Sequence, residues 1–114
     1  MFLTLMMIFV GGLVSSVCHG PCGLVTAVDK ATGEPLVKGK KVTGFSDEEE
    51  TAVGLIEKVP FSLEGELKRM GGLYEQGPAW APYLAVDGRL ITGQNPASSA
   101  LAGHEIVRQL KESA

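Results

Sequence analysis

The 114-residue sequence is poor in the residue types on which several functional classes depend. It contains two cysteines and two histidines, only 6% of its residues are aromatic, and its formal net charge is −3. An acidic balance argues against a phosphate-binding surface, so we expect no nucleic-acid partner. Cys18 and Cys22 form neither a disulfide framework nor a paired zinc motif. His104 begins a His-Glu-x-x sequence, but Arg108 stands where the second histidine of a zinc protease is needed. We therefore expect no metal and no cofactor.

Charge is also missing from the N-terminal region. No Asp, Glu, Lys or Arg occurs among residues 1–28, and the first ten residues are almost entirely apolar. Such a run is similar to the core of a secretory signal, but no basic residue precedes it. A membrane span needs about 20 apolar residues, and glycines and serines within residues 11–16 interrupt the run too early. We predict a buried helix over residues 1–10 and a buried strand over 13–17, in a cytoplasmic protein without a membrane segment.

The overall composition is typical of a globular protein. Hydrophobic residues make up 45% of the sequence and charged residues 20%, which is typical of a protein that folds around a core. Strand-like and helix-like segments alternate, which favours an α/β layer fold. The predicted strands cover residues 13–17, 41–45, 83–86 and 90–92; a loop or short β-excursion covers 29–41; helices cover 20–28, a segment starting at 47, 60–70 and 96–111.

Several local signals set the ends of these elements. Ser46 is a good N-cap for the acidic helix start that follows it. Pro60 opens the next predicted helix. The Asp-Gly pair at residues 87–88 predicts a tight turn between two strands. Asn95 caps the last helix, with Pro96 at its first position. Residues repeat at helical spacing along that helix, with His104 on its apolar seam or rim: Ala100, Leu101, His104, Val107 and Leu110 or Lys111.

The segment from Ser16 to Gly20 is the candidate site of chemistry. Cys18 follows an apolar strand, with small residues two positions before and after it, as in a nucleophile elbow. A helix beginning at Gly20 is expected to stabilise the thiolate and lower the pKa of Cys18. His19 is placed to act as a base or acid. The alternatives are a buried inert thiol at Cys18 and an exposed turn histidine, while Cys22 is expected to fill the core.

Residues 17–21, Val-Cys-His-Gly-Pro, closely resemble the nucleophile motif of the DJ/PfpI superfamily, the class I glutamine amidotransferase-like proteins. Three more segments resemble one branch of it, the heat-shock glyoxalase and chaperone proteins, and they occur in that branch's order: residues 39–50, 59–67 and 90–98. The resemblance implies a flavodoxin-like three-layer α/β sandwich. It also implies a glutathione-independent glyoxalase of the glyoxalase III, or D-lactate dehydratase, type, which converts methylglyoxal to D-lactate without a cofactor.

The resemblance also implies roles for individual residues. Cys18 matches the nucleophile and His19 its neighbouring histidine, while the acidic member of the triad falls within residues 47–50, with Glu50 the best match. The partners implied are a small α-oxoaldehyde substrate and a second copy of the chain in a homo-oligomer.

Members of this branch are roughly twice as long, beyond the size of a minimal domain. We therefore expect residues 11–114 to correspond to the C-terminal part of such a domain, with residues 1–10 as a replacement helix or a truncation artefact. The resemblance places a glycine-rich loop and a glutamate that binds the cysteine ahead of the elbow, and residues 1–10 contain no carboxylate. Impaired catalysis is expected. The alternative functions are a non-catalytic, stress-related holdase chaperone and an inactive fragment.

Overall fold

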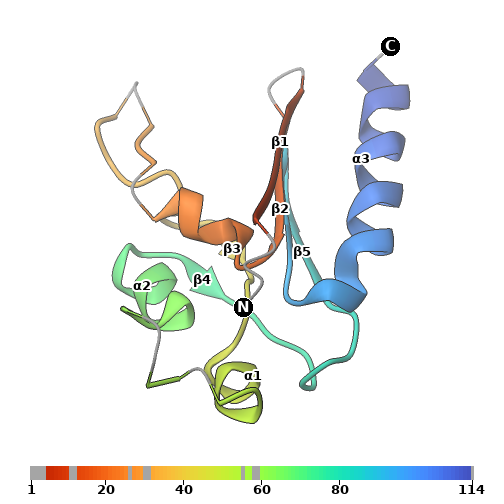
Figure 1. Cartoon of the computed structure of the whole chain (residues 1–114). Helices are drawn as coiled ribbons and strands as arrows, with labels where there is room; N and C mark the ends of the chain where they lie inside the picture. Colours follow the sequence, from red (N-terminus) through yellow and green to blue (C-terminus); the bar gives the residue numbers. More distant parts are fainter. Residues whose placement is uncertain are drawn as a thin grey trace.

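The computed structural model describes residues 5–10, 13–25, 27–29, 32–54, 56–57 and 60–113. A four-stranded sheet lies at the centre of this part of the chain (Figure 1). Its strands run in the order β1-β2-β6-β5. A small second sheet pairs β3 with β4 in parallel. The strands are β1 Leu5–Val10, β2 Leu13–Cys18, β3 Lys41–Val42, β4 Leu73–Tyr74, β5 Leu84–Asp87 and β6 Leu90–Gly93.

Helices lie on both sides of the main sheet, so the fold is of the α/β class. The long helix α3 (Ser99–Ser113) lies on one side, and η1 (Gly20–Leu24) and α2 (Leu63–Arg69) lie on the opposite side (Figure 1). The α-helices are α1 Asp47–Ala52, α2 Leu63–Arg69 and α3 Ser99–Ser113, and the 3-10 helices are η1 Gly20–Leu24 and η2 Pro96–Ser98.

The central strand β2 is buried on both faces, as predicted, and its two serines, Ser15 and Ser16, are buried together with its apolar residues. It pairs with β6 in parallel and with β1 antiparallel. Leu13 and Val17 pack on the face that α3 covers, in a cluster with Ile91 and Ala102. Cys18 joins the second cluster, on the opposite face. The two-residue period of the strand therefore divides the core into two layers and places Cys18 in the layer away from α3.

Most of the predicted elements are confirmed within a few residues. The strands predicted at 13–17, 83–86 and 90–92 are β2, β5 and β6. Gly88 adopts a positive φ of 58° in the turn between β5 and β6, which explains the Asp-Gly signal there. Ser46 caps α1, and Asn95 precedes the helical turn that begins with Pro96.

Other predictions were wrong. Residues 5–10 form a strand rather than a helix; an apolar run this short fits either structure, and pairing with β2 decides it. The segment after the elbow is the five-residue η1 rather than a helix to residue 28. Helix α2 begins at Leu63, after the N-cap Ser62, instead of at Pro60. The strand expected over 41–45 is only two residues long, and its partner β4 was not predicted.

The apolar repeat noted in the last helix does not mark the side that faces the sheet. Leu101 is 42% exposed and Val107 is 51% exposed. The sheet contacts another side of α3, which includes Ala102 and Ile106. Apolar residues occur on both sides of this helix, so packing against β2 and β6 decided which side is buried. No helix within the described ranges is long and apolar enough to cross a membrane.

Candidate active site

Cys18 lies at the end of β2, where the chain turns sharply away from the sheet. Its φ is +59°, a left-handed conformation that non-glycine residues rarely adopt. The turn is held on both sides, because Phe45 N–H donates to the Cys18 carbonyl at 2.9 Å and Cys22 N–H donates to the His19 carbonyl at 3.0 Å. This is the strained strand-to-helix turn that the small residues around Cys18 predicted.

Three side chains form a hydrogen-bonded chain at this turn. The Cys18 Sγ lies 3.6 Å from His19 Nδ1, and His19 Nε2 lies 2.9 Å from Glu50 Oε1. All three residues are buried, with exposures of 4%, 6% and 1%. In the tautomer that donates from Nε2 to the Glu50 carboxylate, the proton of the His19 ring lies on Nε2. The Nδ1 atom is then free to accept the proton of the Cys18 thiol.

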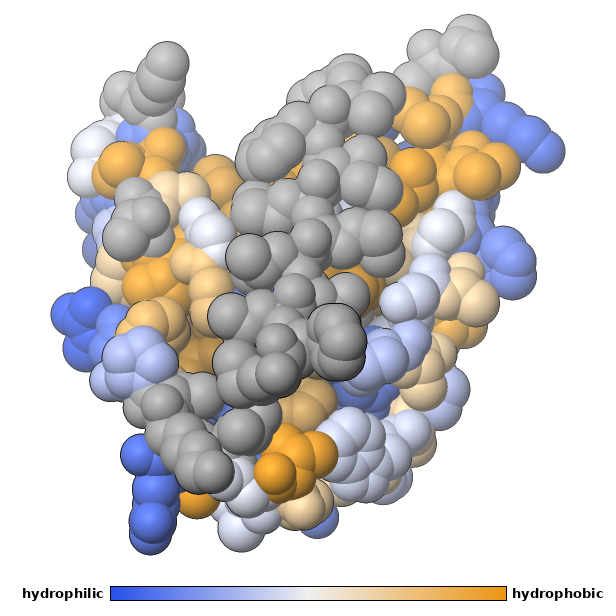
Figure 2. Space-filling model, in the orientation of Figure 1, coloured by the Kyte–Doolittle hydropathy of each residue, from blue (hydrophilic) through white to orange (hydrophobic). Residues whose placement is uncertain are grey.

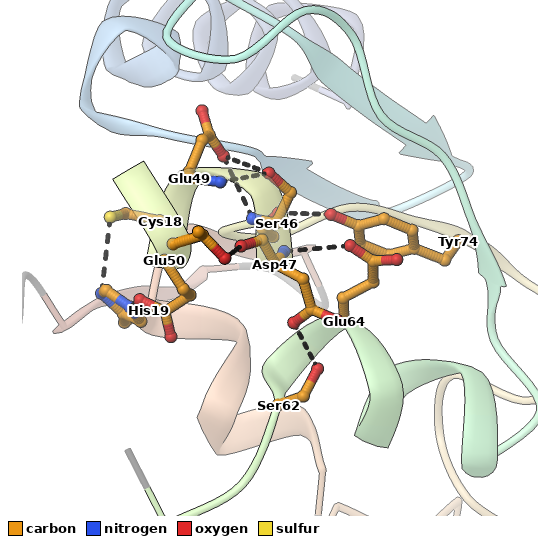
Figure 3. Close-up of polar contacts among 11 residues, drawn as sticks. Cys18, His19, Ser46, Asp47, Glu49, Glu50, Ser62, Glu64 and Tyr74 are labelled. Atoms are coloured by element: carbon orange, nitrogen blue, oxygen red, sulfur yellow. Dashed lines mark hydrogen bonds and ion pairs between the residues drawn. The ribbon is translucent and has the colours of Figure 1, made fainter. Parts of the chain in front are cut away.

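Helix α1 carries Glu50 to this position. Its first turn is closed by a capping box, in which Ser46 Oγ accepts from Glu49 N–H and the Glu49 carboxylate accepts from Ser46 N–H. Phe45, directly before the cap, packs its ring against His19 with centroids 4.4 Å apart. The segment 45–50 therefore supplies both an aromatic neighbour and a carboxylate partner to His19. Figure 3 shows His19 beside Cys18 and Glu50.

The expected lowering of the thiol pKa was wrong. The pKa of Cys18 is raised to about 11, mainly by burial and in smaller part by the nearby carboxylates of Glu49 and Glu50, and the His19 backbone N–H opposes this rise only in part. The helix expected to stabilise a thiolate is only a short 3-10 helix. The resting state at neutral pH is therefore a thiol beside a histidine, which needs a base to become a nucleophile.

The second cysteine has a different environment. Cys22 is half-buried and packs against the core cluster that contains Cys18, in line with its expected place in the core. Burial also raises the pKa of Cys22. Both cysteines are free thiols. Across the described ranges, no group of three or more His, Cys, Asp or Glu residues is arranged to hold a metal ion.

Sequence reasoning missed several residues around the site. Glu49 is fully buried and binds groups from distant parts of the chain. Trp80 has a positive φ of 68°, and its ring packs edge-on against Phe45 with centroids 5.5 Å apart. The capping-box spacing from Ser46 was a usable signal for Glu49. The sequence around Trp80 carries no comparable signal, because its contacts depend on residues more than 30 positions away.

The chain is similar to proteins of known structure and name. It is 45% identical over 95 residues to the glutathione-independent glyoxalase HSP31 of Saccharomyces cerevisiae, with 78% of this chain and 40% of that protein covered. It is 37% identical over 103 residues to glyoxalase 3 of Candida albicans, with 85% of this chain and 43% of that protein covered.

The fold similarity agrees with the sequence similarity. The crystal structure of glyoxalase III from Candida albicans superimposes with a TM-score of 0.80 at 35% identity, covering 86% of this chain and 43% of that one. No protein-family model matches the sequence. The chain thus spans about two-fifths of the length of the curated relatives that it matches.

Proposed function

Because this chain is a member of the DJ/PfpI superfamily, in the branch of the glutathione-independent glyoxalases, we propose that it converts methylglyoxal and water to D-lactate. The observation that carries this proposal is the hydrogen-bonded chain from Cys18 through His19 to Glu50 at a strained elbow. Cys18 is the proposed nucleophile, His19 the acid and base, and Glu50 the carboxylate that orients His19. The reaction needs no external oxidant, because the aldehyde carbon is oxidised while the ketone carbon is reduced.

The reaction begins at the buried thiol. His19 Nδ1 removes the thiol proton as Cys18 Sγ attacks the aldehyde carbon, and the resulting alkoxide takes up a proton to give a hemithioacetal. Glu50 stabilises the imidazolium that forms, because its carboxylate lies 2.9 Å from His19 Nε2. A raised thiol pKa suits this order of events, since the charge on sulfur develops only when the substrate is present to receive it.

Proton transfer and hydrolysis complete the cycle. A proton leaves the aldehyde-derived carbon and another adds to the neighbouring carbon, while the hydroxyl proton on the first carbon is replaced by one on the former ketone oxygen, so that the hemithioacetal becomes a thioester of lactate. Water then attacks the thioester carbonyl, the carbon–sulfur bond breaks, and the thiolate recovers its proton. His19 is the base within hydrogen-bond reach of Cys18 for these steps.

The activity of the 114-residue chain is expected to be weak. The resemblance implies a glycine-rich loop near the oxyanion and a further glutamate, both ahead of the elbow in the longer proteins. Loss of one oxyanion donor typically lowers the rate by about 100- to 1000-fold.

The test measures D-lactate from methylglyoxal with the purified chain, beside Cys18→Ser and the matched control Cys22→Ser. We expect the Cys18→Ser protein to lose D-lactate formation and the Cys22→Ser protein to retain it. Equal rates in the unsubstituted chain and Cys18→Ser would exclude Cys18 as the nucleophile. A folded chain that forms no D-lactate above the uncatalysed rate would exclude the activity for this length of chain.

The cellular setting is part of the same proposal. A cysteine nucleophile needs a free thiol, and both thiols of this chain are free, which suits the reducing cytoplasm. We also propose that the chain forms a homo-oligomer.

A second candidate function is a holdase chaperone, favoured by the large apolar side chains that reach the surface: Val28, Val53, Phe61, Leu73, Trp80, Leu101 and Val107. Figure 2 shows apolar surface at several places on one face of the molecule. Light scattering of a heat-aggregating client separates the two functions, because Cys18→Ser removes catalysis and leaves this surface intact.

A further inference from the structure

Glu49 is a buried carboxylate that the proposed reaction does not use. It is fully buried, and its two oxygens accept hydrogen bonds from five donors. These donors are Ser46 N–H at 3.0 Å, Ser46 Oγ at 3.0 Å, Gln94 Nε2 at 3.1 Å, Trp80 N–H at 2.9 Å and Asn95 Nδ2 at 2.8 Å. A buried charge is tolerated only where it is hydrogen-bonded in this way, so the arrangement depends on every one of these groups.

The five donors come from three segments that are distant in sequence. Ser46 belongs to the cap of α1, Trp80 to the loop between β4 and β5, and Gln94 and Asn95 to the turn after β6. Figure 3 shows the Glu49 side chain pointing away from His19, although Glu50 is the next residue. Glu49 therefore does not touch Cys18 or His19. Instead, it connects the cap of α1, the Trp80 loop and the turn after β6 through its hydrogen bonds.

The segment that Glu49 anchors holds His19 on two sides. Phe45 packs on the His19 ring, and Glu50 accepts its Nε2 hydrogen. Glu49 fixes one end of this segment through Ser46, which directly follows Phe45. It also supports Phe45 indirectly, because it accepts a hydrogen bond from the backbone N–H of Trp80, whose ring packs on Phe45.

We propose that Glu49 is a positioning residue, whose ionised carboxylate locks segment 45–50 to the Trp80 loop and to the turn after β6, and so fixes the His19 ring between Phe45 and Glu50. The catalytic consequence rests on the proposed function, whereas the effect on the His19 ring does not.

The protonation state of Glu49 fits this positioning role. Burial alone raises the pKa of Glu49, but the hydrogen bonds from Asn95, Trp80, Ser46 and Gln94 outweigh burial and lower it. Glu49 is therefore charged at neutral pH.

The decisive variant is Glu49→Gln, with Glu48→Gln as the matched control, since Glu48 is an exposed residue of the same helical turn. Glutamine keeps the shape of Glu49 but turns an NH2 group toward donors, so at least one hydrogen bond is lost. The first readout is the pair of ring 15N NMR shifts of His19, with the exposed His104 as internal reference. We expect the His19 shifts of Glu49→Gln to move toward those of His104 and those of Glu48→Gln to stay unchanged.

Two further readouts follow the same change. Trp80 is the only tryptophan of the chain, so acrylamide quenching reports on it alone, and we expect quenching to increase in Glu49→Gln only. The turnover number is expected to fall roughly 10- to 100-fold with KM changed less than threefold, because a small misplacement of a catalytic group costs rates of this order. Unchanged His19 shifts in a folded Glu49→Gln protein would overturn the proposal. Absence of any glyoxalase activity in the unsubstituted chain would overturn only the proposed function.

A milder variant covers the case in which Glu49→Gln does not fold. Gln94→Met keeps the length of the side chain and removes one donor to Glu49, together with the hydrogen bond from Gln94 to the Gly77 carbonyl and the one it accepts from Gly77 N–H. We expect the His19 shifts to move in the same direction as above, by a smaller amount. A folded Gln94→Met protein with the His19 shifts of the unsubstituted chain would contradict the positioning role.

Discussion

At the scale of single residues, Cys18 and Glu50 contribute differently to the candidate site. Burial raises the pKa of the Cys18 thiol, and Glu50 forms a hydrogen bond with His19 that orients its ring. The site is thus prepared as a neutral thiol and an oriented base instead of a preformed thiolate. This difference from the sequence-based expectation can be measured directly.

The reactivity of Cys18 toward iodoacetamide is expected to follow its raised pKa. Because the folded pKa of about 11 lies above the ordinary value of 9.0, less thiolate is present at any pH below 11. Alkylation should therefore rise about tenfold per pH unit from pH 7 to 10 without a plateau. Mass spectrometry with fragmentation distinguishes Cys18 from Cys22, and the urea-unfolded chain is the control. A plateau for Cys18 below pH 8 would mean that the thiolate is stabilised after all.

Removal of the Glu50 charge is expected to impair the proposed catalysis. In Glu50→Gln the residue no longer stabilises an imidazolium at His19, and D-lactate formation should fall about 100-fold or more. The exposed Glu48→Gln variant serves as the control for the loss of one negative charge from α1. Full activity of a folded Glu50→Gln protein, together with loss of activity in Cys18→Ser, would remove Glu50 from the site.

At the scale of the elements, the side of a helix that packs against the sheet or its neighbours determines which of its side chains are buried. Helix α2 buries Leu63 and Leu67 in the cluster that contains Cys18. Helix α3 buries Ala102 and leaves Leu101 about half-exposed. A leucine therefore contributes more to stability in α2 than at position 101 of α3.

Two leucine substitutions test this difference. Leu67→Ala is expected to lower the free energy of unfolding by about 2–5 kcal/mol, because it leaves a cavity in the core around Cys18. Leu101→Ala is the matched control and is expected to change it by less than about 0.5 kcal/mol, because Leu101 is half-exposed. Urea denaturation followed by circular dichroism measures both. Equal losses in the two variants would mean that Leu101 is buried in solution, for example between copies of the chain.

At the scale of the whole molecule, apolar side chains are exposed on several elements. Leu101 and Val107 lie on the side of α3 away from the sheet, and Leu73 is exposed on β4. Exposed apolar surface of more than a few hundred Å2 drives association of soluble proteins. This is the physical basis for the proposed homo-oligomer.

The purified chain is therefore expected to elute as a species heavier than the 12.0 kDa monomer when size-exclusion chromatography is coupled to light scattering. Val107→Lys should shift the population toward the monomer, since it places a charge on the exposed side of α3. Thr51→Lys, at an exposed position of α1, is the charge-matched control and should not. A sharp monomer peak with cooperative thermal unfolding would contradict association and show that the sequence closes its own core.

Local physics made much of this protein predictable from its sequence. Four signals act on the backbone within a few residues: the apolar run before the elbow, the small residues around Cys18, the capping Ser46 and the Asp-Gly pair at residues 87–88. They therefore predicted β2, the elbow, the start of α1 and the β5–β6 hairpin. The resemblance added Glu50 to the candidate site, and the fold brings it to His19.

The tertiary structure decided the properties that depend on distant segments. Strand pairing with β2 made residues 5–10 a strand, and packing against the sheet selected the buried side of α3. Burial and the carboxylates of α1 raised the pKa of Cys18 against the direction expected from a helix N-terminus. The donors around Glu49 come from segments up to 46 residues away. Short-range signals fix backbone turns and caps, whereas dielectric environment and long-range hydrogen bonds exist only once the chain has folded.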